Sequence, residues 1–185
     1  MEEGRTLRAD ARRNRERLLE TAKTAFAEDG LSVPLDEIAR RAGVGPGTLY
    51  RHFPTKEELF EAVVHERLRG LVDDARALPG TGTALFGFIE RLVLDAAAKR
   101  DLVDALAGAG VDVRTTVAAT AAELRGEIGR LFRGAQESGE VRADIEIADL
   151  MALLSGLFFA LRSRTNAQAD PGRALAVLCD GLRTH

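Results

Sequence analysis

Cysteine is nearly absent from this sequence, which excludes one common way of stabilising a small fold. The 185 residues contain a single cysteine, Cys179, so no disulfide framework can form within the chain. One free thiol fits a reducing cytoplasm, where we expect the protein to reside. Cys179 lies in the apolar stretch 175–182, and we interpret it as a small core residue rather than a redox sensor.

Long hydrophobic runs and catalytic patterns are missing as well. No apolar run approaches the roughly 20 residues needed to cross a bilayer. The N-terminal segment has no apolar core typical of a secretory signal, so we expect no membrane partner. The histidines, His52, His65 and His185, lack metal-ligand spacing, and no nucleophile elbow or phosphate-binding glycine loop is present. We therefore expect no enzyme, no cofactor and no metal site.

The net charge of −3 taken alone argues against a nucleic-acid partner, but the charge is unevenly distributed. Residues 1–56 carry 11 Lys and Arg against 9 Asp and Glu, whereas the remainder carries 15 against 20. Six arginines fall within residues 5–17. This distribution indicates a basic front that can meet phosphates and an acidic rear. We expect residues 1–10 to form a mobile basic arm, with Arg12 and Arg13 close to the nucleic acid.

The apolar spacing is helical almost throughout, and all five prolines fall between periodic segments. The sequence thus predicts an all-α protein of about nine helices. Residues 11–55 would form a three-helix DNA-binding domain, and residues 56–185 a helical regulatory and dimerisation domain. The expected helices are 11–29, 34–42, 46–52, 55–78, 83–99, 101–108, 114–138, 144–163 and 170–183.

Residues 34–56 have the pattern of a helix-turn-helix. The turn Ala42-Gly43-Val44-Gly45 joins two short helices, where Gly43 can adopt a left-handed conformation and Val44 can fill the angle between them. Leu49 and Phe53 lie four residues apart and are expected to face inward. A basic helix is often only a solvated face, but these signals occur together and in the order that a helix-turn-helix requires. The outer face would then carry Pro46, Gly47, Thr48, Tyr50, Arg51 and His52.

The outer residues suit contacts with the major groove. Arg51 is the strongest candidate for guanine O6 and N7, because arginine forms bidentate hydrogen bonds with that base edge. Tyr50 and His52 can reach phosphates, and Lys56 can hold another phosphate at the start of the next helix. Gly47 is costly inside a helix unless another object approaches its backbone closely. DNA is such an object.

The segment LDEIARRAGVGPGTLYRHFPTKEELFEAVV resembles the DNA-binding domain of the TetR-type bacterial transcriptional regulators. The following stretches, AVVHERLRGLVDDARAL, FGFIERLVLDAA and DALAGAGVDV, are similar to the SbtR-like branch of that family. The resemblance implies a homodimer, usually a repressor, whose rear domain often binds a small molecule. It places DNA contacts on Thr48, Tyr50, Arg51, His52 and Lys56, and it also matches Gly47 and Pro34. Pro34 departs from the threonine of many relatives and lacks the hydroxyl that would bond a phosphate.

The segment 150–161 is apolar on nearly all sides, which is typical of a helix covered on more than one face. We expect a two-fold dimer built as a four-helix bundle from the last two helices, with a monomer as the alternative. Such a dimer would place two DNA-binding domains about 34–36 Å apart or more on a near-palindromic operator. The expected interface residues are Leu153, Leu154, Gly156, Leu157, Phe158, Leu161, Leu175, Leu178, Gly181 and Leu182.

A small-molecule pocket in the rear domain is the least constrained expectation. Asp95 is surrounded by apolar neighbours in sequence, and a buried carboxylate needs a partner. Surface or capping roles remain open for every polar candidate, including Asp104 and Arg114. A regulator without an effector, with a filled rear core, is the alternative function. The expected lining residues are His65, Leu68, Phe88, Leu92, Asp95, Leu106, Thr116, Thr120 and Phe159.

Overall fold

The computed structural model describes residues 2–98, 115–162 and 170–184, and it confirms the all-α prediction. In this part of the chain, β-pairing is limited to one isolated bridge between Val141 and Arg183. None of its helices is both long and apolar enough to span a membrane. The expected helix 101–108, with Asp104 and Leu106, and Arg114 lie outside the described residues. The elements are α1 (Glu2–Asp29), η1 (Gly30–Ser32), α2 (Leu35–Arg41), α3 (Pro46–His52), α4 (Lys56–Ala77), α5 (Gly82–Ala98), α7 (Thr115–Glu137), α8 (Ile147–Arg162) and α9 (Pro171–Leu182).

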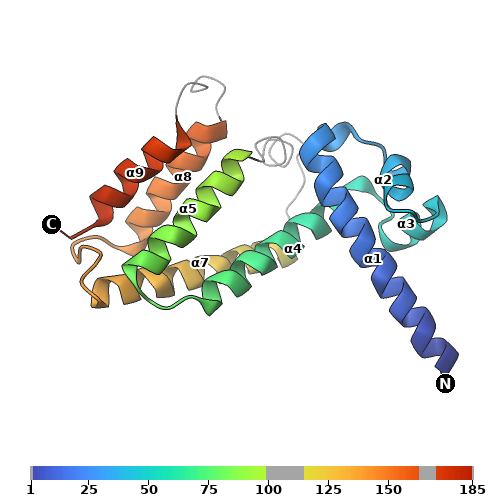
Figure 1. Cartoon of the computed structure of the whole chain (residues 1–185), viewed down its shortest axis with the longest axis horizontal. Coiled ribbons are helices and arrows are strands. Elements are labelled where there is room, and N and C mark those ends of the chain that lie inside the picture. Colours follow the sequence, from blue (N-terminus) through green and yellow to red (C-terminus); the bar gives the residue numbers. More distant parts are fainter. Residues whose placement is uncertain (1, 99–114, 163–169, 185) are drawn as a thin grey trace.

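Two hydrophobic cores divide the molecule, and α4 contributes to both (Figure 1). The front core unites α1, α2 and α3 with the first part of α4, through Leu59, Phe60 and Val63. The rear core unites α5, α7, α8 and α9 with the last part of α4, through Val72 and Ala75. Because burial of apolar side chains is the main favourable term in folding, each core holds its own end of α4 in place.

Side-chain caps begin two of the helices where the sequence indicated. The Thr55 hydroxyl accepts a hydrogen bond of 3.2 Å from the Glu58 amide and starts α4. The Asp170 carboxylate accepts one of 2.9 Å from the Gly172 amide and starts α9, with Pro171 in its first turn. Such caps satisfy amides that have no partner within the helix.

The N-terminal segment differs from expectation, because α1 continues back to Glu2 where a mobile arm was predicted. Figure 1 shows this end of α1 projecting beyond the other helices. Charged side chains one turn apart support it: Arg12 pairs with Glu16 at 3.5 Å, and Arg13 pairs with Asp10. Pairs at this spacing stabilise a helix even without tertiary packing.

The helix predicted from residue 144 begins at Ile147 instead. Arg142 forms two hydrogen bonds of 2.6 Å with the Asp144 carboxylate, which holds this segment in a loop. The Gln136 amide donates hydrogen bonds of 3.0 Å to the Arg142 and Ile145 carbonyls. The Asp149 carboxylate then accepts one of 2.8 Å from the Glu146 amide and marks the start of α8.

The loop before α5 crosses α7 at a point where each segment carries a glycine, Gly80 in the loop and Gly134 in α7. A Cβ built on Gly134 would lie 2.6 Å from the Gly80 Cα, which is closer than any real contact. Gly126, on the same helix, has no atom within 4 Å of such a Cβ. Gly126 and Gly134 therefore both lie inside α7, but Gly134 is in close contact with another segment and Gly126 is not.

We expect Gly134→Ala to destabilise the protein and Gly126→Ala to stabilise it. The first substitution forces α7 and the loop apart, at a cost of about 1–3 kcal/mol typical of overpacking. The second removes the helix penalty of glycine, about 0.5–1 kcal/mol. Urea unfolding followed by circular dichroism measures both changes. Equal effects at the two positions would contradict the close approach of Gly80 and Gly134.

Candidate DNA interface

The turn between α2 and α3 is held by backbone hydrogen bonds around a glycine with positive φ. Gly43 has φ +64°, and its amide donates to the Arg40 carbonyl at 3.2 Å. The Val44 amide donates to the Ala39 carbonyl at 3.1 Å, and the Val44 side chain packs against the front core. A left-handed glycine followed by an apolar residue is a common helix end, and it sets the angle at which α3 leaves α2.

The inner face of α3 is fully buried and fixes the orientation of the helix. Leu49 and Phe53 pack in the front core with Ile38, as the four-residue spacing predicted. The Arg15 guanidinium of α1 lies 5.3 Å from the Phe53 ring centroid, a cation–π contact that joins α1 to the end of α3. The opposite face of α3 is consequently turned outward.

The outer face carries the residues that the sequence singled out. Pro46, Gly47 and Arg51 are exposed, as is Pro34 before α2. Thr48 and His52 are half-buried at the edges of this face, and Tyr50 is 45% exposed. Among the described residues, no atom outside its own helical turn lies within 4 Å of a Cβ built on Gly47. The chain itself therefore places no steric demand for glycine at position 47.

Lys56 has a second role that the sequence did not reveal. Its ammonium donates a hydrogen bond of 3.0 Å to the Leu31 carbonyl and is half-buried. This contact ties the start of α4 to η1, and it engages one of the three ammonium hydrogens. Lys56 thus combines a structural contact with a position at the N-terminus of α4, where an anion is favoured.

The cations of α2 are neutralised within the domain. Glu37 accepts hydrogen bonds of 2.7 Å from Arg40 and 2.8 Å from Arg41. These bonds lower the pKa of Glu37 to about 2. Arg41 also pairs with Asp29 at 2.7 Å. Arg40 and Arg41 are therefore engaged by carboxylates, and the positive charge offered to DNA comes from α1, α3 and Lys56.

Tyr50 is connected to α2 by a contact that sequence reasoning missed. Its hydroxyl donates a hydrogen bond of 3.2 Å to the Asp36 carboxylate in the first turn of α2. This bond raises the pKa of Tyr50, because the neighbouring carboxylate favours the neutral phenol. The two residues lie 14 positions apart, so no periodicity in the sequence points to the pair.

The residues expected to line a pocket are not brought together as one group. Phe88 and Thr120 are buried, and Leu68 and Leu92 pack against the rear core. The side chains of Asp95 and Thr116 lie outside the described residues. Of the other two, His65 borders a surface groove beside Arg15 and His52, and Phe159 is 75% exposed.

The expected dimer residues divide into two groups. Leu154, Leu175 and Leu182 are buried in the rear core of their own chain, which leaves them little surface to offer a partner. Leu157, Phe158 and Leu178 are half-buried, and the Leu161 side chain lies outside the described residues. The exposed members are Leu153, Gly156 and Gly181. Phe159 and Val177, at 75% and 74% exposure, extend the exposed apolar face of α8 and α9, although sequence reasoning did not assign them to it.

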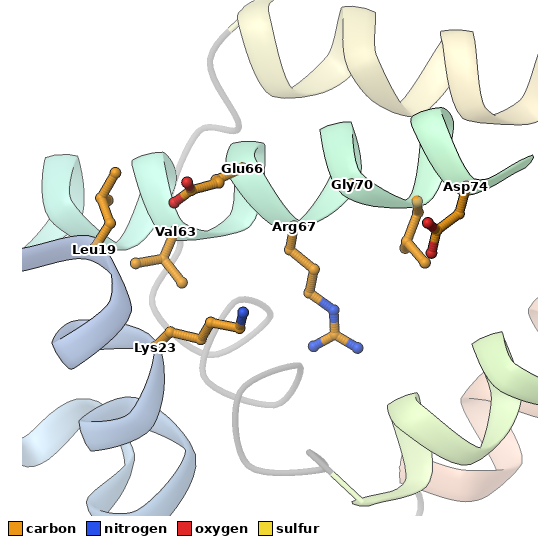
Figure 2. Close-up of a pocket in the computed structure, with 8 residues that line it drawn as sticks. Leu19, Lys23, Val63, Glu66, Arg67, Gly70 and Asp74 are labelled. Carbon is orange, nitrogen blue, oxygen red and sulfur yellow. The ribbon is translucent and has the colours of Figure 1, made fainter. Parts of the chain in front are cut away.

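A crevice lies between α1 and the middle of α4. Figure 2 shows its walls, with Leu19 and Lys23 on α1 and Val63, Glu66, Arg67, Gly70 and Asp74 on α4. Its volume is about 230 Å³. The Arg67 side chain extends from α4 into this space. The middle of α4 is therefore less covered than its two ends.

A helix-turn-helix with an outward basic face, mounted on a larger helical domain, defines a class of transcription regulators. Residues 18–63 match the family model of the tetR family of bacterial regulatory proteins. Residues 80–184 match that of the SbtR-like transcriptional regulator C-terminal domain. The chain therefore belongs to the TetR family, whose members bind DNA as dimers, and to its SbtR-like branch.

Relatives over the full length agree with this assignment. A TetR regulator from Mycobacterium vanbaalenii is 47% identical with a TM-score of 0.76, over 96% of this chain and 99% of that one. The regulator SCO0520 from Streptomyces coelicolor is 34% identical with a TM-score of 0.70, over 91% and 98%. The regulator UidR from Escherichia coli is 28% identical over 96% of this chain and 93% of its own length. Family members are transcription regulators rather than enzymes.

We expect Gly47→Ala to leave the fold intact while weakening DNA binding. The added methyl group meets no other element in the part of the chain that the structure describes, and alanine favours the helix by up to about 1 kcal/mol. If DNA approaches the backbone here, the methyl group lies in its path. Thermal unfolding and fluorescence anisotropy with a selected duplex measure the two effects. Unchanged DNA affinity would show that no close approach occurs at Gly47.

Proposed function

We propose that this protein is a repressor that binds a near-palindromic operator as a homodimer and is released by a small-molecule effector. The outward face of α3 supports the DNA-binding part of this proposal, because Gly47, Tyr50 and Arg51 are exposed on the side opposite the buried Leu49. The N-terminal end of α3 enters the major groove, as recognition helices of this kind do. Arg51 reads guanine, while Thr48, Tyr50, His52 and Lys56 contact phosphates.

The exposed apolar face of α8 and α9 supports the dimer. Leu153, Phe159 and Val177 are large hydrophobic side chains, each more than half exposed in the single chain. In the described ranges, no atom outside their own helices lies within 4 Å of a Cβ built on Gly156 or Gly181, so a partner helix can approach closely there. Two copies of this face form a four-helix bundle around a two-fold axis. The same symmetry requires an operator made of two related half-sites.

The α4 helix is the proposed route by which an effector acts on DNA binding. Arg76 of α4 bonds Glu123 of α7 at 2.7 Å, and Arg69 bonds the same carboxylate at 3.0 Å. Arg130 of α7 donates hydrogen bonds of 2.7 and 3.2 Å to the Ala75 and Leu78 carbonyls at the end of α4. A rearrangement among the rear helices therefore moves the rear end of α4.

When the rear end of α4 moves, its front end moves the DNA-binding helices packed against it. The crevice beside Gly70 leaves room for α4 to change its angle to α1. Two binding domains held at a different separation no longer match both half-sites, which favours release.

We expect Arg51→Ala to reduce operator affinity by about 1–3 kcal/mol and to relax the base preference at one position of each half-site. Arg125→Ala is the matched control, because Arg125 is an exposed arginine on α7, outside the proposed interface. Operator sites are first selected from a random DNA pool with the unmodified protein, and Kd values are then compared. Retention of full affinity and preference by Arg51→Ala would contradict the assignment of base reading to Arg51.

We expect Phe159→Asp to convert the dimer to a monomer, because a two-fold interface would bury two unpaired carboxylates. Loss of the second DNA-binding domain then lowers operator affinity by at least about 100-fold. Leu94→Asp is the control, since Leu94 is an exposed apolar residue of α5, outside the proposed bundle. Sedimentation and DNA binding measure the two changes. A dimeric Phe159→Asp protein would place the interface elsewhere.

A further inference from the structure

The Asp36 carboxylate lies on the surface that the proposed function turns toward DNA, which is an unusual place for a negative charge. Asp36 belongs to the first turn of α2 and is exposed. Its hydrogen-bond partner, Tyr50, lies on the outer face of α3. The pair therefore bridges the two helices of the helix-turn-helix on its open side.

Asp36 differs from its neighbour Glu37 in how its charge is balanced. Glu37 is held by Arg40 and Arg41 at 2.7 and 2.8 Å. In the described part of the chain, no lysine or arginine forms an ion pair with Asp36, and its side-chain partner is the neutral Tyr50 hydroxyl. The Asp36 charge is therefore not cancelled within the protein.

DNA binding creates two competing acceptors for the Tyr50 hydroxyl of this pair. A phenol has one hydroxyl hydrogen, so Tyr50 can donate to Asp36 or to a phosphate, but not to both. When Tyr50 turns to a phosphate, the Asp36 carboxylate loses its donor beside a row of negative charges. Binding then depends on whether the DNA supplies a replacement donor.

We propose that Asp36 determines sequence specificity by accepting a hydrogen bond from the N4 amino group of a cytosine in the major groove. This inference rests on the proposed function, because it requires α2 and α3 to face DNA. Aspartate and glutamate are the side chains suited to this amino group. Where the sequence lacks a cytosine there, the carboxylate remains without a donor and opposes binding. Asp36 thus favours the operator mainly by penalising other sequences.

The test compares Asp36→Ala, Asp36→Asn and Tyr50→Phe in the full chain. Each variant is titrated with the duplex selected by the unmodified protein, with its single-base variants and with a random duplex of equal length. Asp73→Asn, an exposed residue of α4 outside the proposed interface, controls for the loss of one negative charge.

We expect Asp36→Ala to bind the random duplex more tightly, and its preference for the selected site to fall by roughly 10- to 100-fold. One C·G pair in each half-site should then lose its influence on affinity. Asp36→Asn keeps an acceptor for Tyr50 but should shift that position toward adenine, which asparagine recognises. Tyr50→Phe should weaken binding to both duplexes by the same factor and keep the cytosine preference.

Equal changes on both duplexes in Asp36→Ala, with every base preference retained, would overturn the proposal and make Asp36 a simple surface charge. Failure of the proposed function gives a different result. In that case the unmodified protein selects no DNA sequence at all. It then binds the selected and random duplexes equally, before any variant is compared.

Discussion

The packing of one helix into two hydrophobic cores constrains everything else in this protein. Leu59, Phe60 and Val63 fix the front of α4 among the DNA-binding helices, and Val72 and Ala75 fix its rear among the others. A helix is stiff over this length, so the two cores cannot move independently. Between them, α4 is bordered by a crevice of about 230 Å³. In the proposed mechanism, α4 changes its angle to α1 beside this crevice while both cores keep their packing.

The net charge also differs between the front and rear parts of the protein. The chain carries a net charge of −3, yet its first 56 residues are basic. Within this front part, Glu37 and Asp29 engage the arginines of α2, which leaves the cations of α1, Arg51 and Lys56 to offer positive charge. Because the α2 arginines are engaged by other carboxylates, the charge of Asp36 is not offset on its own helix, and it would weigh against DNA binding.

Much of the front domain could be predicted from the sequence because local rules decide it. Gly43 ends α2, Thr55 caps α4, and the four-residue spacing of Leu49 and Phe53 identifies the buried face of α3. The Asp36–Tyr50 contact could not be predicted, since it depends on how two helices cross. The same limit applies to α8. A helix that is apolar all round does not say which side meets its own core, so the burial of Leu154 and the exposure of Phe159 could not be predicted.

The central claim is that two copies of residues 34–56 read DNA together. Hydroxyl-radical footprinting on a site selected from random DNA tests this claim most directly. The account predicts two protected segments on one face of the duplex, related by two-fold symmetry and separated by about one helical turn or more. Each segment should be centred on a major groove. A single asymmetric footprint, or uniform protection without a selected sequence, would contradict it.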